Sequence, residues 1–293
     1  MPAIIYLQSG AAMHHAIGRL AAVILCLAGL STSSQLHAET TWERIQRTGE
    51  VRIGYANEVP FAYSDLQGKV TGESPEIAKA VFARLGIKTI KPVLTEWGAL
   101  IPGLQANRFD VIAAGMYITP ERMQQVLFAD PHYQLDDTLL VRKGNSRKLH
   151  SFADIARDPS LKLAVMAGTV EYDYAIKGGV RESQILQVPN TIAQFQAVKT
   201  KRAHAAVGTR LTMKDMASKS KGRMEAVEVF HDDPAHIGYG ALAFRKGDED
   251  LREAVNGALK EWIGSDDHLR TVAPFGFDRG NLTDKTLADF ERP

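Results

Sequence analysis

Arg122 is the residue of this sequence whose type and position suggest the most specific binding chemistry. It ends the segment Ile118-Thr-Pro-Glu-Arg122, in which Thr119 and Pro120 suit the N-cap and the first position of a helix. A guanidinium keeps its charge at neutral pH, and its planar fork can meet both oxygens of a carboxylate. The start of the predicted helix adds positive potential. Such an arginine could bind a carboxylate; the alternative is a solvated helix arginine, such as Arg108.

Patterns for other chemistries are absent from the sequence. The chain has 35 basic and 34 acidic residues, whereas a nucleic-acid-binding protein usually carries a basic excess. The sequence contains no Gly-x-Ser-x-Gly elbow and no phosphate-binding loop. No metal site is expected, because the histidines His204, His231, His236 and His268 are scattered and show no i, i+4 pairing. No cofactor is expected either.

The first 38 residues differ from the rest of the chain. Arg19 is their only Lys, Arg, Asp or Glu residue, and it precedes the unbroken apolar run Leu20 to Leu30. A polar stretch then leads to Ala38, so we predict a secretory signal peptide cleaved after that residue. The apolar run is too short for a membrane-spanning helix. The only Cys, Cys26, lies in this segment, so the exported domain would contain no thiol. The start codon could be Met1 or Met13.

From residue 50 onward, predicted strands alternate with predicted helices. We expect strands over 51–56, 91–94, 110–114, 161–166, 185–188 and 203–207, and helices over 75–85, 97–106, 169–176, 192–200 and 251–263. Strands at this spacing with helical connections predict parallel α/β sheets, and two successive sets of them predict two lobes. The last dozen residues are polar, and we expect them to be loose.

Eight short motifs follow one another between Thr41 and Phe277. They are GYANEVPF at 54–61, GESPEI at 72–77, WGALIPGL at 97–104, FDVIAAG at 109–115, ITPER at 118–122, FADP at 128–131, AGT at 167–169 and YGALAFRKGD at 239–248. Each is weak alone. In this order and spacing they resemble the periplasmic solute-binding proteins of polar amino-acid ABC transporters, the bacterial extracellular solute-binding protein family 3. Within that family, the first five motifs are most similar to ectoine/hydroxyectoine-binding proteins.

The resemblance implies an α/β fold with two lobes, the type II periplasmic binding protein fold. Each lobe is expected to be a mostly parallel sheet flanked by helices, and the lobes close on a ligand. Mapped onto this chain, lobe 1 would comprise residues 39–132 and 240–293, and lobe 2 residues 137–234. The two hinge crossings would lie near 132–136 and 235–239.

The resemblance also assigns the residues that would hold a ligand carboxylate. Arg122 would bind its oxygens, and Gly168 and Thr169 would add a backbone N–H and a hydroxyl at a helix start. The pattern small residue-Gly-Thr before a helix is also that of an ordinary N-cap. Thr169 could cap the helix and contact the ligand at the same time. Gly115, which ends the fourth motif, is placed in the same cleft.

Phe61, Trp97 and Tyr117 indicate which chemical group the other end of the expected ligand carries. Amino-acid binders of this family usually have an Asp at the position of Thr209, which pairs with an α-ammonium. A primary ammonium buried without a carboxylate would be costly. Three aromatic faces suit a delocalised cation instead, and Glu58 could accept the N–H groups of a cyclic amidinium. The alternatives are that Phe61 and Trp97 are core residues and that Glu58 is a surface acid.

Two functions from different classes therefore stay open. The first is a monomeric periplasmic binding protein that closes on ectoine or hydroxyectoine and delivers it to the permease subunits of an ABC importer. A polar amino acid or a betaine is the alternative ligand. The second is an exported cyclohexadienyl dehydratase-like enzyme on the same fold, with Glu58 or Glu171 as the general acid.

Overall fold

The strands of the described chain, residues 38–291 of this computed structural model, form two main sheets and one small hairpin. The predicted signal peptide lies outside the described residues except for Ala38. No helix within residues 38–291 has the length and apolar character needed to cross a bilayer.

The first sheet has the strand order β4-β1-β5-β13-β6, and β7 pairs with β13 beside β6. Its strands are β1 (Glu50–Tyr55), β4 (Thr89–Leu94), β5 (Val111–Tyr117), β6 (Val126–Phe128), β7 (Tyr133–Leu135) and β13 (Gly238–Arg245). β1 pairs in parallel with β4 and β5, and β13 pairs antiparallel with β5, β6 and β7.

The second sheet has the strand order β10-β9-β11-β8-β12. Its strands are β8 (Asp137–Arg142), β9 (Leu163–Met166), β10 (Ile185–Val188), β11 (Ala205–Thr209) and β12 (Met224–Ala226). β9 pairs in parallel with β10 and β11, whereas β8 is antiparallel to β11 and β12. The hairpin joins β2 (Tyr63–Ser64) to β3 (Val70–Thr71).

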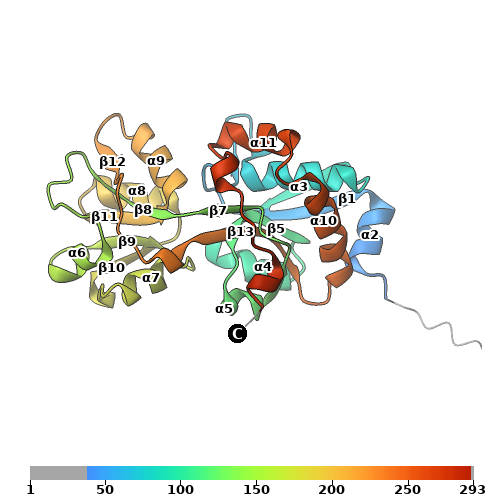
Figure 1. Cartoon of the computed structure of the whole chain (residues 1–293), viewed down its shortest axis with the longest axis horizontal. Coiled ribbons are helices and arrows are strands. Elements are labelled where there is room, and N and C mark those ends of the chain that lie inside the picture. The colour runs from blue at the N-terminus through green and yellow to red at the C-terminus, as the bar shows by residue number, and fades with distance from the viewer. Residues whose placement is uncertain (1–37, 292–293) are drawn as a thin grey trace, which may run out of the picture. The chain divides into compact units, whose positions relative to one another are not determined.

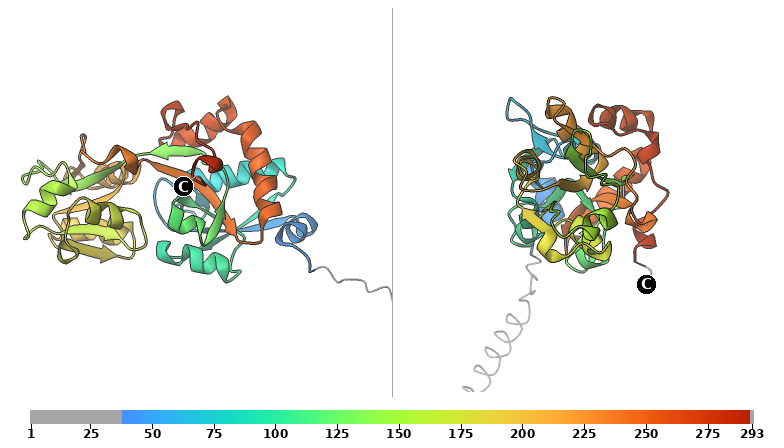
Figure 2. Two further views of the ribbon diagram at one scale, coloured as in Figure 1. Left: turned by 60° about the horizontal axis from the view of Figure 1, so that its bottom comes forward. Right: turned by 90° about the vertical axis from the view of Figure 1, so that its left-hand side faces the viewer.

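Helices accompany each sheet (Figures 1 and 2). Around the first sheet lie α2 (Thr41–Thr48), α3 (Glu73–Arg84), α4 (Leu100–Gln105), α5 (Pro120–Met123), α10 (Glu249–Trp262) and α11 (Asp266–Val272). Around the second lie α6 (Phe152–Arg157), α7 (Glu171–Lys177), α8 (Thr191–Lys199) and α9 (Arg210–Lys219). Each sheet contributes to two buried apolar clusters. The residues that position the site are therefore anchored in the apolar clusters of both sheets.

Two connections join the sheets. β7 ends at Leu135 and β8 begins at Asp137, whereas β12 ends at Ala226 and β13 begins at Gly238. In Figure 1, β7 and β13 lie side by side where the chain passes between the sheets, in agreement with their pairing. The lobe and hinge boundaries drawn from the sequence stay predictions.

Each sheet is mostly parallel, as expected, and contains one strand of the opposite direction, β13 in the first sheet and β8 in the second. β8 enters the second sheet directly from β7, and β13 enters the first sheet through a loop and the short 3-10 helix Pro234–His236. Neither has the helical crossover that a parallel neighbour requires, so both strands run antiparallel to their partners.

The C-terminal segment is the clearest correction to the sequence analysis. The last dozen residues were expected to be loose, but Leu287 and Phe290 pack against the apolar cluster of the first sheet. The amide of Leu287 donates to Asp130 Oδ1 at 2.8 Å, and the Phe290 ring lies 5.2 Å from that of Tyr239. Two apolar side chains in a polar stretch were enough to dock it.

Candidate functional site

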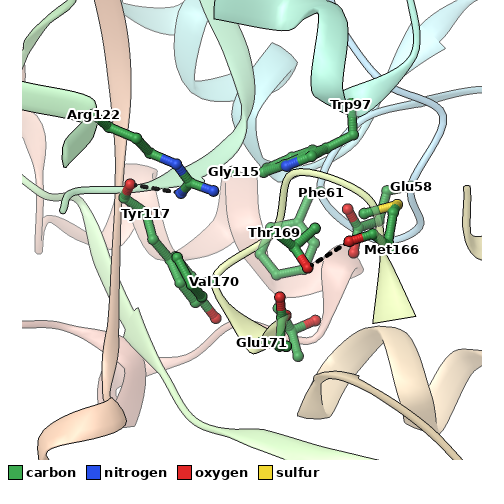
Figure 3. A pocket seen from close by; sticks show the side chains of 11 residues that line it. Glu58, Phe61, Trp97, Gly115, Tyr117, Arg122, Met166, Thr169, Val170 and Glu171 are labelled. Atoms are coloured by element: carbon green, nitrogen blue, oxygen red, sulfur yellow. Dashed lines mark hydrogen bonds between the residues drawn. The ribbon is translucent and has the colours of Figure 1, made fainter. Parts of the chain in front are cut away.

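A chamber lies between residues of the two sheets. All of the predicted site residues line it except Gly168 (Figure 3). Its lining consists of Glu58, Phe61, Trp97, Gly115, Tyr117, Arg122, Met166, Thr169, Val170, Glu171 and Thr209. The first six come from the first sheet and its loops, and the last five come from the second. The geometry therefore brings together residues that are up to 151 positions apart in the sequence.

Arg122 is held where the sequence analysis expects it. The Thr119 side chain caps α5 by accepting from the Arg122 amide at 3.2 Å. The guanidinium donates to the carbonyl of Tyr117 at 2.9 Å and to that of Gly168 at 3.2 Å. These contacts use two of its five N–H donors. Within residues 38–291 the guanidinium forms no ion pair, and burial lowers its pKa. A buried cation without a counter-ion favours an anionic ligand.

Gly168 takes part through its carbonyl rather than as a lining residue. That oxygen accepts from Trp97 Nε1 at 3.1 Å and from Arg122 Nη2 at 3.2 Å. Both contacts connect a loop of the second sheet to residues of the first. Gly168 therefore fixes two binding side chains and joins the two halves of the chamber.

Thr169 lines the chamber but does not begin the helix as expected. α7 starts at Glu171, and the Thr169 hydroxyl donates to the carbonyl of Met166 at 3.0 Å. The hydroxyl therefore stabilises its own turn, and it must rotate before it can donate to a ligand.

The three aromatic residues are not equivalent. Phe61 is only 1% exposed and also belongs to the core, where its ring lies 5.6 Å from the rings of Tyr133 and Phe277. Trp97 faces the Arg122 guanidinium, whose carbon lies 5.8 Å from the indole centroid. The Tyr117 hydroxyl is buried and has no hydrogen-bond partner among the described residues.

Two glycines make room for these rings. A Cβ at Gly115 would lie 2.4 Å from a ring carbon of Phe61, and Gly115 has a φ of +74°. A Cβ at Gly238 would lie 2.0 Å from Cε2 of Tyr117. The sequence analysis did not identify Gly238, because its contact with Tyr117 depends on how β13 passes β5.

Glu58 is buried, not a surface acid. Its Oε1 accepts from the Thr212 hydroxyl at 3.0 Å, and the Thr212 and Thr209 hydroxyls lie 2.9 Å apart. Burial and the nearby Glu171 carboxylate raise the pKa of Glu58 to about 8, against a weaker lowering by Thr212. Thr209 therefore lies at the end of a hydroxyl chain that leads to Glu58.

Two further buried acids accompany Glu58. Glu171, the first residue of α7, lines the chamber, and Asp137 begins β8. Burial raises the pKa of both carboxyls, and their mutual proximity adds to the effect for Asp137. The sequence singles out Glu171 only as the general acid of the dehydratase alternative, and it gives Asp137 no role. Asp137 is the first residue of the predicted lobe 2, directly after the predicted hinge.

The relatives of this chain include ABC transporter binding proteins and an enzyme. A probable amino-acid ABC transporter periplasmic-binding protein of Sinorhizobium fredii is 38% identical over 267 residues, covering 89% of this chain and 87% of the relative. The crystal structure of EhuB in complex with hydroxyectoine superposes with a TM-score of 0.80 at 31% identity, covering 86% of this chain and 98% of EhuB. Cyclohexadienyl dehydratase of Pseudomonas aeruginosa is 25% identical over 180 residues, covering 61% of this chain and 66% of the enzyme.

The structural similarity confirms the two-lobe type II periplasmic binding protein fold that the motifs predicted. The family model of the bacterial extracellular solute-binding proteins, family 3, matches residues 51–272. That match spans the strands and helices from β1 to α11, including every residue of the chamber. The chain belongs to the bacterial extracellular solute-binding proteins, family 3.

Proposed function

We propose that this protein is the substrate-binding component of an amino-acid-type ABC importer, exported to the periplasm, and that its ligand is ectoine or hydroxyectoine. One observation carries the proposal: a single chamber is lined by Arg122, whose guanidinium forms no ion pair among residues 38–291, and also by Glu58 and three aromatic rings. Membership of the solute-binding family and the similarity to hydroxyectoine-bound EhuB support it.

The carboxylate of the ligand pairs with Arg122. The two carbonyls that accept from the guanidinium hold its plane, and the remaining N–H groups are left for a bidentate contact. Pairing also supplies the negative charge that a buried guanidinium requires. Thr169 contributes its hydroxyl after rotation.

The ring cation of the ligand lies against the aromatic side chains. Ectoine carries a cyclic amidinium, which is delocalised and weakly hydrated. Trp97 and Tyr117 offer ring faces, and each cation–π contact contributes about 0.5 to 2 kcal/mol when desolvated. Glu58 accepts an amidinium N–H, and the arriving cation favours its ionised form.

Closure of the lobes completes the site. The contacts from Trp97 and Arg122 to Gly168, and from Thr212 to Glu58, join residues of the two sheets. A ligand that contacts both halves stabilises the closed form because those contacts exist only there.

Thermal unfolding of residues 39–293 against a ligand panel tests the proposal. The panel is ectoine, hydroxyectoine, proline betaine, glycine betaine, glutamine, arginine and histidine. A ligand at 100 times its dissociation constant adds about 2.7 kcal/mol of stability. We expect the largest shifts with the two ectoines. A larger shift with any other compound would refute the ligand assignment.

A second candidate is favoured by the state of Glu58. With a pKa of about 8, this carboxyl is mostly protonated at neutral pH, as a general acid must be. The similarity to cyclohexadienyl dehydratase makes prephenate and arogenate the substrates to test. Formation of the aromatic product by the wild-type protein, and its loss in Glu58→Gln, would establish the enzyme.

A further inference from the structure

The chamber contains more carboxylates than a ligand with one N–H contact needs. Glu171 lines it and is 6% exposed, and Asp137 is 4% exposed. Glu171 Oε2 and both carboxylate oxygens of Asp137 are buried and have no hydrogen-bond partner among residues 38–291. Buried acceptors without donors are costly. These oxygens therefore point to a donor that the described chain does not supply.

Asp137 lies on the chamber face of the second sheet. It pairs directly with Thr209 across the antiparallel β8–β11 ladder. Directly opposed residues in such a ladder project to the same face, with Cβ atoms about 4.5 to 5.5 Å apart. Asp137 therefore projects to the same face as Thr209, although it does not itself line the chamber, and it lies close enough to Glu171 for that carboxylate to raise its pKa.

The charges of the chamber do not balance when all of its acids are ionised. Glu58, Glu171 and Asp137 lie near the cation Arg122, and the other cation that acts on Asp137, Arg210, is already paired with Asp136. The other titratable groups nearby are Tyr117 on β5, Tyr133 on β7, Tyr174 on α7, Asp136 just before β8 and Asp232 before β13, and none of them is a cation. At least one acid therefore stays protonated. A metal ion does not resolve the imbalance, because within residues 38–291 no group of three or more acids, histidines or cysteines is arranged to hold one.

Glu58 and Glu171 reach the chamber from different sheets. Glu58 follows β1, and Glu171 begins α7 beside β9. Figure 3 shows both side chains directed toward the same space, on either side of Thr169. In a cyclic amidinium the two N–H bonds point outward from different ring edges, so a single carboxylate cannot accept both. Two carboxylates supplied by two lobes match that geometry.

We propose that Glu171 accepts a second N–H of the ligand cation from the lobe-2 side, and that Asp137 is a positioning residue that stays protonated beside it. The inference rests on the proposed function. It specifies the ligand class as a carboxylate that carries a planar cation with N–H groups on two edges, an amidinium or a guanidinium. When the cation binds, Glu171 gives its proton to solvent, and the carboxylate then receives a charge-assisted hydrogen bond.

Calorimetric titration of the purified protein tests this assignment with three probes. Ectoine carries an amidinium, L-arginine carries a guanidinium, and glycine betaine carries a cation without any N–H. Glu171→Gln should weaken the binding of ectoine by about 10- to 100-fold, the loss expected for one charge-assisted hydrogen bond. Asp137→Asn should stay within about threefold of wild type, because the amide imitates a protonated acid. Asp173→Asn, an exposed acid two positions along α7, is the matched control and should not change the affinity.

Proton release separates a direct role of Glu171 from a structural one. Titration in two buffers with different ionisation enthalpies counts the protons released per ligand. Glu171→Gln should release fewer protons than wild type, and Asp137→Asn should release as many. If Glu171→Gln does not fold, Glu171→Asp provides a second variant, because the shortened carboxylate should also weaken binding.

The outcomes distinguish this inference from the proposed function. If wild type binds ectoine and Glu171→Gln binds it equally well, the role of Glu171 is refuted and the proposed function stands. If wild type binds L-arginine but not ectoine, and Glu171→Gln loses that binding, the proposed ligand is wrong and the inference stands. A loss in Asp137→Asn as large as that in Glu171→Gln would contradict a protonated Asp137. Binding of neither N–H probe would overturn both.

Discussion

At the scale of single residues, the chemistry of the chamber depends on burial that no local pattern shows. The family resemblance identifies Arg122, and the Thr-Pro helix start predicted before it is present. The sequence could not show that Glu58, Glu171 and Asp137 share one buried space, because they are separated by up to 113 positions. The burial of an acid is set by tertiary packing, so only the structure shows that Glu171 and Asp137 are buried near Glu58.

Replacing Arg122 should abolish most of the binding. Arg122→Ala leaves a ligand carboxylate buried without a partner, so ectoine affinity should fall by about 100-fold or more. Arg122→Lys keeps the charge but loses the fork, and should recover only part of the affinity. Calorimetry measures both variants. Arg108→Ala, an exposed arginine, serves as the control, and an unchanged affinity in Arg122→Ala would remove the residue from the site.

Glu58 should make the ligand-free protein less stable at high pH. Its folded-state pKa of about 8 lies above the model-peptide value of 4.5, so its contribution to stability is fully present below pH 4.5 and is lost as the pH rises through 8. The Glu58→Gln side chain cannot ionise, so the variant does not lose this stability as the pH rises. The variant should therefore gain several °C in unfolding temperature relative to wild type between pH 5 and pH 9. A constant difference across this range would show that Glu58 is not buried as an acid.

At the scale of elements, the motifs predicted most strands and helices but not how the strands pair. The strand predicted over 110–114 continues to Tyr117, and the helix predicted from Thr169 begins at Glu171. Hydrophobic periodicity identifies the apolar centre of an element, whereas its ends depend on caps and neighbours. The direction of β8 and β13 follows from their short connections, which residue patterns do not encode.

The packing of β13 against β5 should control the position of Tyr117. Gly238→Ala places a methyl group inside the Tyr117 ring, so either the ring or the strand must move. We expect a loss of about 1 to 3 kcal/mol in stability and at least a tenfold loss in ectoine affinity. Thermal unfolding and calorimetry measure the two effects.

Gly257→Ala is the matched control for Gly238→Ala. Gly257 lies within α10, and a Cβ there meets no atom within 4 Å. The substitution should stabilise the protein by up to about 1 kcal/mol and leave binding unchanged. Equal effects of the two substitutions would contradict a specific role for Gly238.

At the scale of the whole molecule, the ligand chamber is bounded by contacts between the two sheets. Trp97 and Arg122 both donate to Gly168, so separating the two sheets at the chamber breaks these contacts. We expect that movement at the two connections near β7 and β13, where the predicted hinges lie. The family resemblance predicts such a hinge, and the interatomic contacts show which bonds must break.

Ectoine should therefore make the protein more compact. Small-angle X-ray scattering of residues 39–293 should give a smaller radius of gyration with saturating ectoine than without it. Trp97→Phe, which loses the indole N–H bond to Gly168, should weaken ectoine binding by about 10-fold or less while keeping the ring face. An identical radius in both states would mean that binding does not involve lobe closure.

The central claim is that this chamber binds ectoine or hydroxyectoine through a carboxylate on Arg122 and an N–H cation on Glu58. Direct calorimetric titration of ectoine into wild type, Arg122→Ala and Glu58→Gln tests it most directly. We expect one ectoine per chain in wild type and at least a tenfold weaker affinity in both variants. Binding of glutamine in place of ectoine, or ectoine binding that survives both substitutions, would contradict the account.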